Sequence, residues 1–316
     1  MSRVVTAMAS DTARRWSTSL QELNRRLPLS RRSRRLIRTG TWMLAWAGLV
    51  FAWVWLNFNP VDYLQDAKVY WRFDFDQLYA SSTVGGREAY LYSPAFAQVL
   101  SPLGILPWPA FKALFSAANL LLLAWMAGPR LGALMLLIPG SPIANEIGVG
   151  NIHLIIAAVV AVGFRLPQAW AFNLLTKITP GVGLLWFVGQ RAWRSLALAL
   201  GATAVIALVS FAIAPHLWFE WADSLRSNTG VAIPAHAVAL PLPLGVRLIA
   251  GAALALVAGI GNWRWLLPLA CFVALPVPWV PALSLLVGSI AIWRGRGRSQ
   301  DAATGNQGEH IGSSST

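Results

Sequence analysis

Long apolar runs separated by polar connections form the dominant pattern along this chain. Residues 41–58 carry no charged side chain over 18 positions, which is about the shortest run that crosses a bilayer as a helix. Nine further apolar segments follow, near residues 92–107, 109–127, 131–144, 150–164, 168–189, 193–214, 243–261, 263–277 and 280–293. The pattern predicts an all-α, polytopic integral membrane protein with about ten transmembrane helices.

Polar stretches divide the chain around these runs. We predict an Arg-rich N-terminal segment at residues 1–38, a membrane domain at residues 39–294 and a disordered tail at residues 295–316, which is rich in Ser, Gly and Thr. A segment of so little hydrophobicity does not sustain a packed core. Two longer polar loops interrupt the membrane domain, at residues 59–91 and 215–240.

The composition agrees with a membrane environment. Hydrophobic residues make up 56% of the chain and charged residues only 12%, whereas a soluble domain carries roughly a quarter charged residues. The formal net charge of +13 raises the alternative of nucleic-acid binding. The basic residues gather at the two ends of the membrane domain, however, so we expect membrane lipids and no nucleic acid as partners.

The distribution of arginines predicts an orientation in the cell membrane. Ten arginines precede the first apolar run, and others follow the last one. Since basic residues concentrate on the cytoplasmic side, we predict cytoplasmic N- and C-termini and extracytoplasmic long loops. Those loops hold seven of the twelve acidic residues: Asp62, Asp66, Asp74, Asp76, Glu88, Glu220 and Asp223. Arg130 and Arg165 fall on the outer side in this arrangement and fit it less well.

The first long loop is the richest in chemically useful side chains. From Asp62 to Tyr79 it reads DYLQDAKVYWRFDFDQLY, with four carboxylates among aromatic residues. A carboxylate at the membrane boundary can act as a general base on a sugar hydroxyl, and burial would raise its pKa toward the working pH. A solvated acidic loop with an aromatic interface belt has the same composition, so both interpretations stay open.

Two polar features interrupt the apolar segments. Lys177 lies within LLTKITPGVGLLW, and an ionisable residue inside a span indicates a functional site, here for a lipid phosphate, unless its side chain reaches the outer interface. The sequence NEIGVGNIHLII contains Asn145, Glu146, Asn151 and His153. It is either a ligand site or a turn capped by Asn151. On a ten-span count this turn is cytoplasmic, away from the acidic loop, unless the short preceding segment does not cross fully.

The second long loop adds Arg226 and His236, either of which could hold a phosphate. The four histidines are not at paired metal-ligand spacing, so we expect no metal site. The chain also lacks a P-loop and a dinucleotide-binding glycine motif. The single cysteine, Cys271, lies in an apolar run and is interpreted as a small buried hydrophobe.

Several stretches together resemble glycosyltransferase family 87, in the order of that family and over roughly residues 40–290. They are D-x-x-V-Y from Asp66, Y-x-Y-x-P-x-F from Tyr90 followed by PLGILP, G-N-x-x-L-I-I-A-A from Gly150, K-x-x-P from Lys177 followed by QRAWRSL, and WRWLLPLACFVALPVPW. The resemblance implies a membrane enzyme of the GT-C fold class. That class includes polyprenyl-phosphate-mannose-dependent α-mannosyltransferases.

The resemblance also implies a mechanism and partners. The donor would be a polyprenyl-phosphate sugar, with mannose the expected sugar, and the acceptor an extracytoplasmic glycolipid or glycan. Asp66 occupies the motif position of the catalytic base, with Asp62 as the fallback. No cofactor is expected, because the leaving group is a stable phosphate monoester. The donor- and acceptor-binding candidates are Asp62, Tyr70, Tyr92, Asn151, His153, Lys177, Arg226 and His236.

The chain departs from the family pattern in three respects. It is shorter than many members, it has Gly-Asn in place of the more usual Gly-Gln, and its second long loop lacks the Asn-Gln-Ser type motif of many relatives. The sequence leaves the sugar, acceptor, linkage and oligomeric state open. Two other classes stay possible: a lipid or solute transporter or flippase, which the nearly pure apolar spans disfavour, and a non-catalytic scaffold of a cell-envelope complex.

Overall fold

The computed structural model describes residues 30–61, 63–86, 89–229, 231 and 238–295. The predicted N-terminal segment up to residue 29 and the tail from residue 296 lie outside these ranges. The chain divides into two compact units, residues 1–44 and residues 45–316. Within the described ranges the regular structure is helical apart from one isolated β-bridge, which confirms the all-α prediction.

The described part of the first unit is the beginning of helix α2 (Arg31–Phe58). Its apolar side chains are largely exposed, among them Leu36, Trp42, Met43 and Leu44. An exposed apolar helix surface of this kind suits contact with lipid rather than with water.

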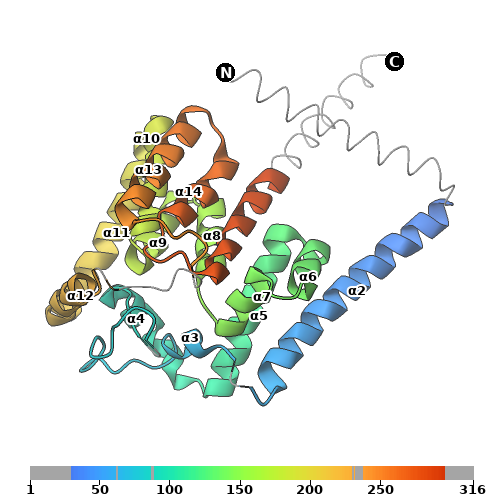
Figure 1. The fold of residues 1–316 in the computed structure, drawn as a ribbon, viewed down its shortest axis with the longest axis horizontal. Coiled ribbons are helices and arrows are strands. Elements are labelled where there is room, and N and C mark those ends of the chain that lie inside the picture. Colours follow the sequence, from blue (N-terminus) through green and yellow to red (C-terminus); the bar gives the residue numbers. More distant parts are fainter. Residues whose placement is uncertain (1–29, 62, 87–88, 230, 232–237, 296–316) are drawn as a thin grey trace, which may run out of the picture. The chain divides into compact units, whose positions relative to one another are not determined.

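The second unit contains the rest of α2 and a series of shorter helices (Figure 1). In chain order these are α3 (Gln65–Lys68), α4 (Pro94–Leu100), η1 (Ser101–Ile105), α5 (Trp108–Ala127), α6 (Pro129–Leu137), α7 (Pro142–Val149), α8 (His153–Val162), η2 (Pro167–Ala169), α9 (Trp170–Thr176), η3 (Thr179–Leu184), α10 (Leu185–Gly189), α11 (Trp193–Ile213), α12 (Pro215–Ser227), α13 (Leu244–Ile260), η5 (Arg264–Leu266), α14 (Leu267–Val273) and η6 (Val280–Leu286). Each predicted apolar segment coincides with one of these helices or with a consecutive set.

Most of these helices are shorter than the predicted spans. In the described residues, three helices are long and apolar enough to cross a membrane: Arg32–Phe58, α5 and α11. The pair α6 and α7 passes the same test together but is bent by 88°, which makes up to four. The bend follows the sequence, because Pro139, Gly140 and Pro142 interrupt the segment and the Ser141 side chain caps α7 by accepting from two backbone N–H groups.

The core of the second unit lies around α8, which packs against both α9 and α14. Leu154, Ile156, Trp170 and Cys271 have no exposed surface there. The prediction that Cys271 is a small buried hydrophobe is therefore confirmed. In contrast, α11 is apolar but mostly exposed, as expected of a helix that faces lipid.

Contacts between segment ends define two ends of the second unit, which the 20 residues of α5 hold about 30 Å apart. At the first, the loop end, Trp71 Nε1 donates to the Leu106 carbonyl just before α5. The Asn228 side chain after α12 accepts from the backbone of Val84 there. At the second, the arginine end, Arg294 donates to the Met126 carbonyl in the last turn of α5.

Further contacts at the arginine end come from Arg264, which lies over the rings of Phe164 and Trp186. The ends of α8, α10 and α13 therefore meet. Ser289, five residues before Arg294, donates through its hydroxyl to the Trp265 carbonyl at 2.7 Å, which places these ends near the end of α5.

The segment at residues 92–107 behaves differently from its prediction as a span. Tyr92, before α4, bonds through its hydroxyl to Tyr70 at 2.8 Å, while the Leu106 carbonyl at the other end bonds to Trp71. Because Tyr70 and Trp71 are consecutive, both ends of α4–η1 lie at the loop end. The two ends of α4–η1 are therefore much closer together than the roughly 30 Å thickness of the hydrocarbon core of a bilayer.

Candidate active site

Asp66 belongs to α3, a single helical turn that is docked on the connection between α7 and α8. Leu64 precedes the turn with a φ of 64° and donates its N–H to the Gly148 carbonyl at 2.7 Å. Gly150 permits this close approach: a Cβ atom there would lie 2.8 Å from the Cβ of Ala67, and its φ of 77° favours glycine. The docking brings Asp66 against the start of α8.

Five side chains form a polar network at this place: Asp66, Glu146, Asn151, His153 and Lys177. Asn151 Nδ2 donates to Asp66 Oδ2 at 2.7 Å, and Lys177 Nζ donates to Asn151 Oδ1 at 3.4 Å. Lys177 Nζ also lies 2.6 Å from His153 Nε2. Glu146 accepts from the His153 backbone N–H at 2.6 Å and lies 2.9 Å from His153 Nδ1. Lys177 is thus linked to two carboxylates, each through one intervening side chain.

The donor and acceptor roles in this network follow from Lys177. A lysine ammonium has three donors and no acceptor, so His153 Nε2 accepts from it and His153 Nδ1 carries the hydrogen that Glu146 receives. This assigns a neutral His153 and an ionised Glu146. Both residues have no exposed surface, and a buried carboxylate is stable only when it is paired and hydrogen-bonded in this way.

The environment of Asp66 suits a group that exchanges a proton. The side chain is half-buried at the loop end, and burial raises the pKa of the Asp66 carboxyl above its ordinary value. The hydrogen bond from Asn151 and the charge of Lys177 oppose this rise because they stabilise the carboxylate, whereas the charge of Glu146 adds to it. Asp66 is therefore a stronger base than an ordinary exposed aspartate.

Tyr70 and Tyr92 form the aromatic wall next to α3. Their hydroxyls are 2.8 Å apart, their ring centres are 5.5 Å apart, and both side chains are buried. The Phe96 ring packs against both of them. The structure thus brings these two candidates together as a support that fixes the first loop beside Asp66.

Other predicted candidates do not join the network. Arg226 lies exposed on α12, where it donates to Asp223 at 2.8 Å. Asp62 and His236 lie outside the described residues. Among the described residues, no group of three or more His, Cys, Asp or Glu side chains could hold a metal ion.

Three expectations for the interior residues need correction. The turn that contains Asn151 does not lie away from the acidic loop, since Asn151 bonds directly to Asp66; the 88° bend between α6 and α7 accompanies this placement. Asn151 does not cap α8, whose N-cap is Ile152 and lacks a side-chain cap bond. The Lys177 side chain does not extend away from the protein, because its Nζ bonds to Asn151 and His153.

Glu146 is the functional candidate that sequence reasoning left without a role. It stands in the NEIGVGNIH stretch, and a buried carboxylate seven residues before a histidine has no local structural explanation. The signal that could have identified it was the helix-breaking PGSP sequence (residues 139–142) before it, which marks a turn inside an apolar segment.

The fold and the site define a helical membrane protein with a cluster of ionisable side chains among its helices. The model of glycosyltransferase family 87 matches residues 90–306, more than half of the chain. The chain therefore belongs to glycosyltransferase family 87, a family of membrane glycosyltransferases. The matched region contains Glu146, Asn151, His153 and Lys177, whereas Asp66 precedes it.

One relative carries a more specific name. The chain is 27% identical to the polyprenol-phosphate-mannose-dependent alpha-(1-2)-phosphatidylinositol mannoside mannosyltransferase of Mycobacterium tuberculosis, over 61% of this chain and 56% of the relative. The alignment thus spans little more than half of that protein's length. No solved structure matches the chain.

Proposed function

We propose that this protein is a GT-C-type glycosyltransferase that moves a sugar, mannose, from a polyprenyl-phosphate donor to a hydroxyl of an extracytoplasmic glycolipid or glycan. The observation that carries the proposal is the Asn151 amide, which bonds to Asp66 on one side and to Lys177 on the other. A base and a cation are thereby held in one site. The name of the Mycobacterium relative supports the donor and the acceptor class.

Asp66 acts as the general base in this mechanism. Its carboxylate takes the proton of the acceptor hydroxyl while the hydroxyl oxygen attacks the anomeric carbon of the donor. The bond between that carbon and the phosphate oxygen breaks, the configuration inverts, and polyprenyl phosphate leaves. Because a phosphate monoester is stable without further assistance, the proposed reaction needs no metal and no cofactor.

Lys177 stabilises the leaving phosphate. Of the three N–H donors of its ammonium group, two serve Asn151 and His153, and the third is assigned to a phosphate oxygen. Glu146 and His153 act as positioning residues, since their hydrogen bonds fix the direction of the ammonium group. Asn151 in turn holds the carboxylate of Asp66 in place.

The contacts between segment ends support an orientation with ten passes and both termini cytoplasmic. In this proposal α4–η1 does not cross, while residues 167–189 make two short passes that turn at Lys177. The arginine end is then cytoplasmic and the polar network lies on the extracytoplasmic side. Arg130, just after α5, and Arg165, just after α8, also fall on the cytoplasmic side, as basic residues prefer.

The test is sugar transfer from labelled polyprenyl-phosphate mannose in membranes that contain the protein. Wild type is expected to form a labelled lipid or glycan product, and Asp66→Asn is expected to lose at least about 100-fold in rate because general-base catalysis contributes that much. Asp76→Asn, an exposed aspartate of the same loop, is the matched control. Equal product from wild type and Asp66→Asn would reject Asp66 as the base, and a non-catalytic scaffold predicts no product from any variant.

A further inference from the structure

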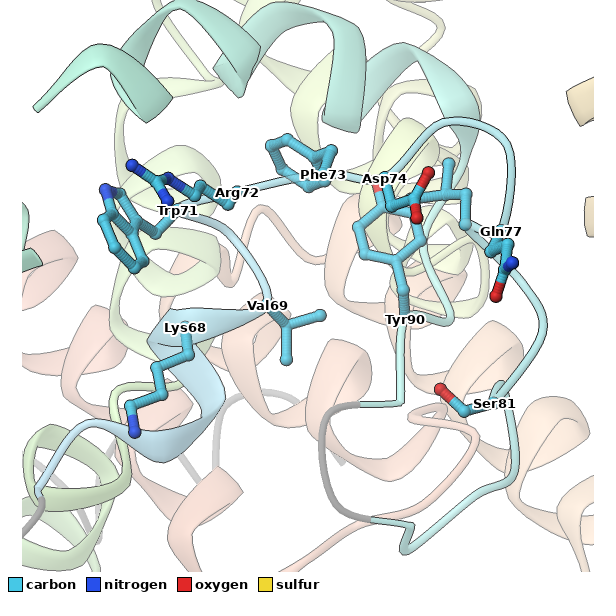
Figure 2. Close-up of a pocket in the computed structure, with 10 residues that line it drawn as sticks. Lys68, Val69, Trp71, Arg72, Phe73, Asp74, Gln77, Ser81 and Tyr90 are labelled. Carbon is cyan, nitrogen blue, oxygen red and sulfur yellow. The ribbon is translucent and has the colours of Figure 1, made fainter.

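A cavity outside the polar network lies beside the end of α3 (Figure 2). Its volume is about 320 Å³, at the lower end of the range for small-molecule sites. Its wall begins at Lys68 and Val69. The Val69 N–H donates to the Asp66 carbonyl at 3.2 Å, so the cavity starts one helical turn from the proposed base.

One side of the cavity combines cations with tryptophan rings. Figure 2 shows Lys68, Trp71 and Arg72 on this side, with the Trp71 ring between the Lys68 amino group and the Arg72 guanidinium. The Arg72 guanidinium lies 4.6 Å from the centre of the Trp71 ring, and Lys68 Nζ lies 5.7 Å from the centre of the Trp108 ring. The Trp71 ring in turn packs 5.3 Å from that of Trp108.

The position of Trp108 indicates where this side lies relative to a bilayer. Trp108 is the first residue of α5, one of the helices long enough to cross a membrane. Tryptophan at the start of a span marks the membrane–water interface, which is also the level of lipid phosphates. An arginine at that level suits a phosphate group, because its planar guanidinium can bond to two phosphate oxygens.

The opposite side of the cavity is polar. Asp74, Gln77 and Ser81 lie there in Figure 2, and Tyr90 lies on the same side of the view as Asp74. All three polar side chains are exposed. A carboxylate, an amide and a hydroxyl in one cavity can exchange hydrogen bonds with several ring hydroxyls, and an aromatic ring can pack on the apolar face of a sugar or cyclitol.

We propose that this cavity binds the head group of the acceptor, a phosphorylated glycolipid, with its phosphate beside Arg72 and its ring hydroxyls beside Asp74, Gln77 and Ser81. The inference rests on the proposed function, because that function requires an acceptor. The donor phosphate belongs instead at Lys177, which does not line the cavity. A head group held here projects from the interface toward the segment that carries Asp66.

The experiment measures lipid binding and requires no catalysis. The full chain, purified in detergent, is mixed with equal amounts of phosphatidylinositol and phosphatidylcholine, and retained lipid is counted by native mass spectrometry. Wild type is expected to prefer phosphatidylinositol, because only that lipid presents ring hydroxyls beside its phosphate. Arg72→Gln and Asp74→Asn are each expected to weaken its retention about tenfold, as loss of a hydrogen bond to a charged group does.

Arg165→Gln and Asp76→Asn are the matched controls, since both side chains are exposed and neither lines the cavity. Asp66→Asn is expected to bind phosphatidylinositol like wild type while it loses transfer, so failure of the proposed function and failure of this inference give different results. The inference is overturned if wild type shows no preference, or if the two cavity variants match the controls. If Arg72→Gln weakened the retention of polyprenyl phosphate as much as that of phosphatidylinositol, the assignment of the cavity to the acceptor would be overturned.

Discussion

Lys177 is the residue on which the arrangement of the polar network depends. Its ammonium group bonds to Asn151 and His153, which in turn bond to the carboxylates of Asp66 and Glu146. Each carboxylate is stabilised through a neutral side chain, so the single positive charge is shared between two negative ones. Removal of one partner from such a buried arrangement leaves a charge without compensation, which is costly.

The pH dependence of transfer should report the environment of Asp66. A base must be deprotonated, so the rate falls as the pH drops through the pKa of Asp66, which burial raises. The acidic limb of the rate profile is therefore expected above the range of an ordinary aspartate, whose pKa is about 3.9. Asn151→Ala removes a hydrogen bond that favours the carboxylate, and it should move this limb to still higher pH. Transfer rates at saturating donor over a pH series provide the measurement.

Asn145→Ala serves as the control for that series, because Asn145 lies on α7 without a place in the network. An acidic limb that stays in place or moves to lower pH in Asn151→Ala would contradict the role given to this amide.

At the scale of helices, interruptions rather than regular segments build the site. Glu146 lies on the short helix α7, Asn151 lies in the turn after it, and His153 begins α8. Lys177 lies between α9 and η3, where the chain leaves helical geometry. Breaks of this kind place side chains and free backbone groups inside a helical membrane protein where continuous helices would present only apolar faces.

The close contact at Gly150 should be essential for docking α3. In Gly150→Ala the new methyl group would meet Ala67 at 2.8 Å in a backbone conformation with φ of 77°, which costs at least about 1 kcal/mol. We expect transfer to fall sharply and the thermal unfolding temperature in detergent to drop. Gly148→Ala is the matched control, since its Cβ would meet only Tyr63 at an ordinary 3.9 Å. Equal activity of the two variants would show that close docking of α3 is unnecessary.

At the scale of the whole molecule, the two ends of the second unit separate the chemistry from the basic residues. The polar network, the cavity beside α3 and α12 share the loop end. The arginines Arg264 and Arg294 occupy the opposite end. The chain thereby presents one face rich in acidic and aromatic residues and one basic face, as a protein oriented in a membrane does.

Cysteine labelling in intact cells tests this orientation. In a Cys271→Ala background, Arg130→Cys and Arg165→Cys are expected to resist a membrane-impermeant maleimide until the cells are permeabilised. Asp223→Cys on α12 is expected to react at once. The simple ten-span count from hydropathy places residues 130 and 165 outside. Their labelling in intact cells would support that count. It would contradict the proposed orientation, in which α4–η1 does not cross the membrane and residues 167–189 cross it twice with a turn at Lys177.

Much of the general picture was available from local sequence patterns. Hydropathy alone indicated a helical membrane protein, because burial of apolar runs in lipid depends on composition over about 20 residues. Lys177 was recognisable for the same reason, as a charge within an apolar run. Glu146 and Arg226 were harder to place. Glu146 is fully buried and Arg226 is exposed, and that difference depends on the packing of helices that are distant in the sequence.

The sequence by itself determined the helical membrane class, the family motifs and the presence of Asp66, Asn151 and Lys177. Only the tertiary structure decided that these residues meet. Asp66 and Asn151 are 85 positions apart, and Asn151 and Lys177 are 26 apart. Periodicity reports which side of one helix is apolar, whereas such meetings depend on where helices bend and how closely they approach. The bend at Pro139–Pro142 and the missing side chain of Gly150 set that geometry here.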